Sequence, residues 1–176
     1  TMTGTMTRTD SIRALGALVL SVPLALAACG GGASPEEATN AGYAALGSGD
    51  AESAVDHFAS ALSALQPGDP GYKRARMGEV EAKVRLAPEA AAGSFLEFAG
   101  AHPEQVEAGD YRKVGVQLSE RKSLKAAVDV LDAGLKRFET DAKLKAAMDL
   151  TMAAAEKSGD TSALDALRGL GYIGGD

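Results

Sequence analysis

Cysteine, histidine and tryptophan are scarce in this chain of 176 residues, which has one cysteine, two histidines and no tryptophan. The single cysteine, Cys29, excludes a disulfide within the chain, so a packed core must hold the fold. The histidines, His57 and His102, lie far apart, whereas a zinc site needs three or four ligands at close spacing. Nucleophilic catalysis needs a cysteine or serine beside a base, and both histidines are expected to be structural or solvated. The sequence therefore predicts no metal, no cofactor and no enzymatic activity.

Basic residues are also in deficit, with 18 Lys and Arg against 24 Asp and Glu and a net charge of −6. An acidic chain is a poor ligand for nucleic acid, so we expect no nucleic-acid partner.

A long apolar run is missing too. Residues 14–28 (ALGALVLSVPLALAA) are apolar, but a membrane-spanning helix needs about 20 such residues. This segment follows Arg8 and Arg13, and that order is typical of a secretory signal.

The apolar segment ends at Leu26, Ala27, Ala28 and Cys29, which resemble the lipobox of bacterial lipoproteins. In that family the cysteine thiol is diacylated and the chain is cut just before it. The resemblance implies a signal peptide over residues 1–28, and a lipidated cysteine with a flexible tether over residues 29–35. It places the protein in the bacterial envelope, attached to the membrane at Cys29. The outer membrane, facing the periplasm, is favoured over the inner membrane because Gly30 rather than aspartate follows the cysteine. The alternative is an apolar helix with a buried cysteine.

The remaining sequence shows helical periodicity and no strand-like alternation, which predicts an all-α protein. Prolines and Gly-Asp pairs divide it into segments, since proline ends one helix and suits the first turn of the next. The expected helices are 35–47, 51–65, 70–86, 88–101, 103–119, 123–138, 141–158 and 161–168.

Small and bulky residues recur along these helices with a period of about 36 residues. In the second helix of each pair the repeated positions are Ala54, Ala91, Ala127 and Ala163, followed by Phe58, Phe95, Leu131 and Leu167. In the first helix of each pair they are Gly42, Gly78, Gly115 and Met152. Small residues let crossing helices approach, and the bulky residue fills the gap to the next helix. Each hairpin then buries its apolar face against its neighbour.

This pattern resembles the tetratricopeptide repeat (TPR). The resemblance implies an α-solenoid of about four TPR-like helix-turn-helix repeats over residues 36–169. Residues 170–176 are expected to form a capping tail in which Leu170, Tyr172 and Ile173 fold back onto the last hairpin. The period exceeds the usual 34 residues of the family. The second copy has Phe98 where a small residue is usual, and the fourth has Met152.

In TPR arrays the first helices line a groove that holds a protein or peptide partner. In this chain the positions that correspond to the groove residues of the family are Thr39, Tyr43, Tyr72, Glu79, Lys83, Arg112, Val116 and Glu120. The two densest basic groups, residues 73–85 and 121–125, are interpreted as solvated helix faces. The expected function is therefore an envelope adaptor or assembly scaffold.

Two alternatives stay open. One is a module that binds a small ligand. The other is an accessory subunit of an exported enzyme, because the tail LRGLGYIGG resembles a segment of sulfatase-associated repeat proteins. The catalytic sulfatase motif itself is absent from the sequence.

Overall fold

The structure is a computed structural model that describes residues 33–174. This part of the chain belongs to one compact unit, Gly32–Asp176. The expected signal peptide, the lipobox residues Leu26, Ala27 and Ala28, and the lipidation site Cys29 lie outside the described residues.

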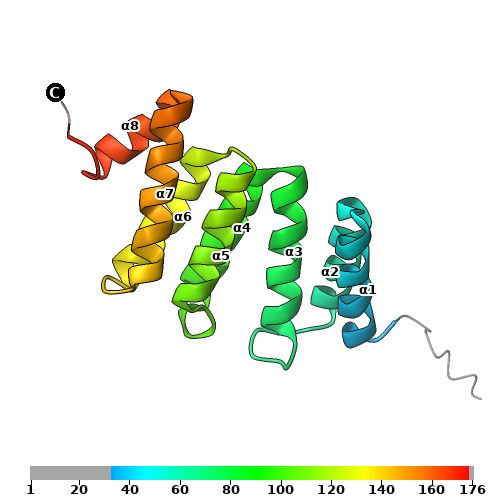
Figure 1. The fold of residues 1–176 in the computed structure, drawn as a ribbon. Coiled ribbons are helices and arrows are strands. Elements are labelled where there is room, and N and C mark those ends of the chain that lie inside the picture. The colour runs from blue at the N-terminus through cyan, green and yellow to red at the C-terminus, as the bar shows by residue number, and fades with distance from the viewer. Residues whose placement is uncertain (1–32, 175–176) are drawn as a thin grey trace, which may run out of the picture. The chain divides into compact units, whose positions relative to one another are not determined.

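Every regular element in the described part is a helix, so the all-α prediction is confirmed (Figure 1). The elements are α1 (Pro35–Ser48), α2 (Ala51–Ser63), α3 (Tyr72–Leu86), α4 (Pro88–Ala101), the 3-10 helix η1 (Pro103–Gln105), α5 (Ala108–Glu120), α6 (Leu124–Arg137), α7 (Ala142–Ser158) and α8 (Thr161–Gly169). Their bounds agree closely with the predicted helices, apart from the segment that follows α4.

The two Gly-Asp pairs end one helix and begin the next by the same means. Gly49 and Gly159 have φ values of 88° and 67°, a left-handed conformation that glycine adopts without steric cost. Asp50 and Asp160 then accept hydrogen bonds from the backbone N–H groups of Ser53 and Ala163, which caps α2 and α8. The recurrence of this pair in the sequence therefore has a local structural reason.

Consecutive helices pack as hairpins, α1 on α2, α3 on α4, α5 on α6 and α7 on α8. Each odd-numbered helix also contacts the next one, so that α1, α3, α5 and α7 lie side by side (Figure 1). Among the even-numbered helices, α4 contacts α6 and α6 contacts α8. Neighbouring hairpins thus bury their faces against each other, and each contributes to a shared interior.

All eight repeated positions of the even-numbered helices are completely buried. They are Ala54, Phe58, Ala91, Phe95, Ala127, Leu131, Ala163 and Leu167. The repeat seen in the sequence is therefore a repeat of core positions.

The glycines of the odd-numbered helices make room for these bulky side chains. A Cβ atom added at Gly42 would lie 2.7 Å from the ring of Phe58, and one at Gly78 only 2.4 Å from the same ring. At Gly115 it would lie 2.6 Å from Leu131. Real Cβ contacts are longer, so these helices approach as they do because the positions have no side chain.

The prediction of one helix over residues 103–119 is wrong. The chain forms the short η1 at Pro103, then an extended residue, Val106, before α5 begins at Ala108. Val106 is 2% exposed and belongs to the main core. Burial of this side chain outweighs the local helical preference that follows Pro103. The carboxylate of Asp110 in the first turn of α5 then accepts a hydrogen bond from the backbone N–H of Glu107 at 2.9 Å, which fixes the start of the helix.

The C-terminal tail turns back onto the last two hairpins. Tyr172 and Ile173 are half-buried against the main core, and the hydroxyl of Tyr172 donates a hydrogen bond to Asp132 of α6 at 3.2 Å. Burial and the nearby carboxylate of Asp132 raise the pKa of Tyr172. Leu170, which was expected to join this contact, is 38% exposed.

Candidate functional site

The outer sides of α1, α3, α5 and α7 form a surface that we call the odd-helix face. Side chains from neighbouring hairpins bridge it. Between α1 and α3, Arg74 donates to the Oδ1 atom of Asn40 at 2.9 Å, and its guanidinium carbon lies 5.0 Å from the centre of the Tyr43 ring. The hydroxyl of Tyr43 donates to the backbone oxygen of Arg74 at 2.9 Å. These contacts hold the first hairpin in register with the second.

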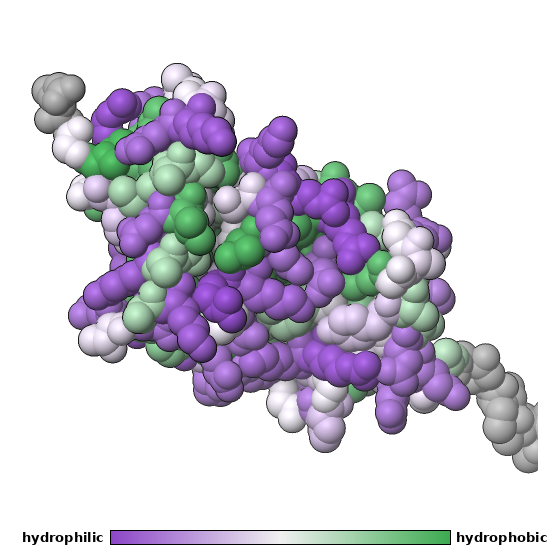
Figure 2. Space-filling model, viewed as in Figure 1, coloured by the Kyte–Doolittle hydropathy of each residue, from purple (hydrophilic) through white to green (hydrophobic). Residues whose placement is uncertain are grey.

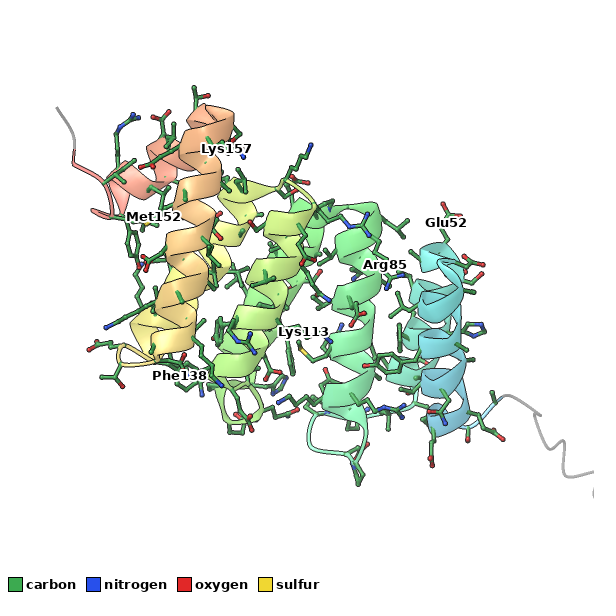
Figure 3. The ribbon with its side chains drawn as sticks, in the orientation of Figure 1. Glu52, Arg85, Lys113, Phe138, Met152 and Lys157 are labelled. Carbon is green, nitrogen blue, oxygen red and sulfur yellow. The ribbon has the colours of Figure 1, made fainter. Side chains whose placement is uncertain are left out.

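Glu81 of α3 is the centre of a second set of bridges. Its carboxylate lies 2.8 Å from the Nζ atom of Lys113 on α5 and 3.6 Å from Arg85 on its own helix. Arg85 also donates to the backbone oxygen of Leu46 at 2.7 Å, near the C-terminal end of α1. Figure 3 labels Arg85, on the side of α3 toward α1, and Lys113 on α5. One chain of polar contacts therefore connects three hairpins.

A further ion pair joins α3 to α5 between Lys73 and Asp110 at 2.8 Å. Lys73, Arg74 and Arg85 belong to the basic group at residues 73–85, for which the sequence pattern predicts a solvated helix face. The structure corrects that interpretation, since all three link one hairpin to another. Their partners lie on other hairpins, and for that reason no local pattern in the sequence reveals them.

Three of the predicted groove residues, Tyr72, Glu79 and Lys83, lie on a different stripe of α3. The Tyr72 ring is 6.2 Å from the ring of Phe98 on α4, which places it inside the second hairpin. Glu79 is 7% exposed and binds Arg76 at 2.6 Å and Lys83 at 2.8 Å. Residues 72, 76, 79 and 83 share one side of a helix because they follow its turns. The structure thus removes these three positions from the odd-helix face, whose α3 residues include Arg74, Glu81 and Arg85.

The two predicted residues of α1 contribute to the fold itself. Thr39 is buried, and its hydroxyl donates to the backbone oxygen of Pro35 at 2.7 Å. Tyr43 is half-buried, with its ring packed edge-on against Phe58 at a centroid distance of 5.0 Å. Burial raises the pKa of Tyr43, and so does the carboxylate of Glu81, while the cations Lys113 and Arg74 act in the opposite direction.

The predicted residues of α5 remain accessible. Arg112 and Glu120 are exposed and Val116 is half-buried. The odd-helix face therefore offers a partner the residues of α5, the bridging charges around Glu81 and the outer side of α7.

The hollows between the odd-numbered helices are small. One of about 260 Å³ lies beside α1 and α3 and is lined by Pro35, Glu36, Thr39, Leu65, Pro70, Gly71 and Arg74. One of about 160 Å³ lies between α3 and α5 and is lined by Glu81, Val84, Arg85, Gln117, Glu120 and Arg121. Charged side chains dominate the second hollow. Neither offers the deep apolar cavity that usually encloses a small hydrophobic ligand.

In residues 33–174 no three or more histidine, cysteine, aspartate or glutamate side chains come together as metal ligands could. Among the described helices none is both long and apolar enough to cross a membrane. Comparison of the chain with protein-family models, with curated proteins and with solved structures found no match.

Proposed function

We propose that this chain is a TPR-like α-solenoid of about four repeats, and that its odd-helix face binds a protein partner. The observation that carries the proposal is the side-by-side packing of α1, α3, α5 and α7, which creates a continuous surface. The buried alanine and bulky positions recur at equivalent places in all four even-numbered helices, as a stack of similar hairpins requires. Such a surface is suited to an elongated segment of another protein.

We further propose that the protein is a bacterial lipoprotein, attached at Cys29 and acting as an adaptor or assembly scaffold in the envelope. This part of the proposal depends on the resemblance of residues 26–29 to the lipobox. A lipid anchor and a glycine-rich tether would keep the repeat domain near the membrane while leaving its binding face free.

A module for a small ligand has less support. Such ligands favour enclosed apolar pockets, whereas the hollows between the odd-numbered helices are small and partly charged. The larger hollows elsewhere, of about 410 to 710 Å³, are open and also lined by charged side chains. An adaptor needs exposed, chemically varied side chains instead, and α5 presents an arginine, a valine and a glutamate along its outer side.

Site-specific photo-cross-linking in native membranes tests the proposed function. A photoreactive amino acid replaces Arg112 on the odd-helix face, and in a matched control it replaces Glu97, an exposed residue of α4. We expect a discrete cross-linked protein from position 112 that position 97 does not give. Equal products from both positions, or none from either, would contradict the proposal.

A further inference from the structure

The most exposed large apolar side chain in the described part of the chain is Leu150 of α7, which is 73% exposed. Ala146 and Ala153, also exposed, lie one turn before it and one turn after it. Single apolar residues on a surface are ordinary, but a contiguous apolar stripe on a charged face points to contact with a partner. We call Leu150, Ala146, Ala153 and Val116 the Leu150 patch.

The buried residues of α7 show which side of this helix carries the patch. Leu144, Met148 and Ala155 are buried in the main core, so the stripe with Leu150 faces outward. In Figure 3 the side chain of Met152 lies on the side of α7 away from α5. Successive residues of an α-helix are rotated by about 100° around its axis. Leu150, two residues before Met152, therefore projects from nearly the opposite side of α7, toward α5, the helix that carries Val116. Figure 2 shows green side chains over α7 and beside it, within a mostly purple face.

Unpaired cations surround the patch. Among the described residues, Arg112, Lys143 and Lys157 form no ion pair, whereas Lys73 and Lys113 are each bound to a carboxylate. Lys143 and Lys157 lie two turns before and two turns after Leu150 on the same stripe of α7. The carboxylate of Glu120 is also exposed on α5, so the balance of these four charges is positive on a chain whose net charge is −6.

We propose that the Leu150 patch docks a partner segment in which an apolar side chain lies between acidic residues. The inference depends on the proposed function and specifies the partner of the odd-helix face. The apolar side chain contacts Leu150 and Val116, and the carboxylates pair with the lysines of α7 and with Arg112.

A second copy of the chain fits the patch less well. A two-fold pair of α7 helices centred on Leu150 would place Lys143 of one copy opposite Lys157 of the other. Like charges facing each other across an interface oppose association. The same lysines attract an acidic segment, and this difference favours a partner over self-association.

The test uses the full chain in mild detergent and three labelled hexapeptides, measured by fluorescence anisotropy. The first has two leucines between two pairs of acidic residues. The second has lysines in place of the acidic residues, and the third has alanines in place of the leucines. We expect the first peptide to bind at least about tenfold more tightly than the other two, with an affinity that falls as salt is added.

Variants assign the binding to the patch. Leu150→Glu should weaken binding of the first peptide about tenfold or more. Leu86→Glu, a control at a leucine that is 48% exposed on α3, should leave the affinity unchanged. Circular dichroism and thermal melting confirm that both variants are folded, as expected for exposed positions.

Each outcome decides the proposal. It is overturned if the lysine peptide binds as well as the acidic one, if none of the peptides binds, or if Leu150→Glu has no more effect than Leu86→Glu. It is also overturned if sedimentation shows a dimer that Leu150→Glu dissociates, because the occupant is then a second copy. A cross-link from position 112 that survives Leu150→Glu would leave the adaptor function intact and remove only this patch.

Discussion

The first hairpin and the three that follow it reach the same arrangement of helices with different side chains. Around α1 and α2 the interior is made mainly of alanines, with Leu46 and Phe58 as its largest buried residues. From α3 to α8 a single larger core contains branched and aromatic side chains, among them Phe95, Leu118 and Leu131. The first hairpin therefore has few large buried side chains, whereas the later ones fill a common interior with many.

This difference locates the part of the molecule where one side chain matters most. Phe58 is completely buried and lies against both Gly42 and Gly78, so it fills the space between α1, α2 and α3. In the larger core the same position, Leu131, has many large neighbours. A local defect should therefore stay local in the first hairpin and spread in the remainder of the domain.

The largest expected effects on stability come from two variants that are compared with each other, Phe58→Ala and Leu131→Ala. Each should lower the free energy of unfolding by about 3–5 kcal/mol, because each removes a fully buried side chain between glycine-bearing helices. Hydrogen exchange should distinguish them. Phe58→Ala should remove protection from α1 and α2 while α5 to α8 retain theirs, and Leu131→Ala should lower protection throughout α5 to α8. A uniform loss in both variants would refute the separation of the two regions.

A smaller effect is expected from Gly78→Ala. The new methyl group would overlap the ring of Phe58, and overpacking of this kind costs about 1–3 kcal/mol. Gly93→Ala is the control, because a Cβ at this position in α4 meets nothing within 4 Å. It should stabilise the protein by about 0.5–1 kcal/mol, since alanine favours a helix over glycine. Chemical denaturation measures both changes, and a neutral Gly78→Ala would mean that the close approach is not needed.

The smallest effect is expected from Glu81→Gln, which breaks the polar chain between the hairpins. The partly exposed pairs of Glu81 should contribute about 0–1 kcal/mol at low salt and less at high salt. The control is Lys125→Gln, whose partner Asp129 lies on the same helix. Thermal melts at two salt concentrations measure the change in stability, and hydrogen exchange should show that protection of α1 falls with Glu81→Gln alone. Equal behaviour of the two variants would show that Glu81 does not couple the hairpins.

Much of the fold could be predicted from the chain because its signals are local. Pro35 and Pro88 begin helices, Gly49 and Gly159 end them, and capping aspartates follow the two glycines. The segment after Pro103 could not be predicted in this way, because it depends on the burial of Val106 in a core built from distant residues.

The candidate site was less accessible to prediction. Arg112, Val116 and Glu120 were found by analogy with a repeat, and the structure leaves them accessible. The prediction placed Tyr72 in the groove, but in the structure its ring packs against Phe98 of α4. The exposure of Leu150 was not recognised, because an apolar residue in a helical stripe is buried or exposed according to which neighbours its helix has.

The sequence by itself determined the helix content, the hairpin breaks and the repeated core positions, since capping, proline geometry and helical periodicity act within a few residues. Only the tertiary structure decided the outward direction of each charged stripe. The chain from Leu46 through Arg85 and Glu81 to Lys113 exists because three hairpins pack at a particular rotation. That rotation is set by the glycines that admit Phe58 and Leu131, a contact between residues far apart in the sequence.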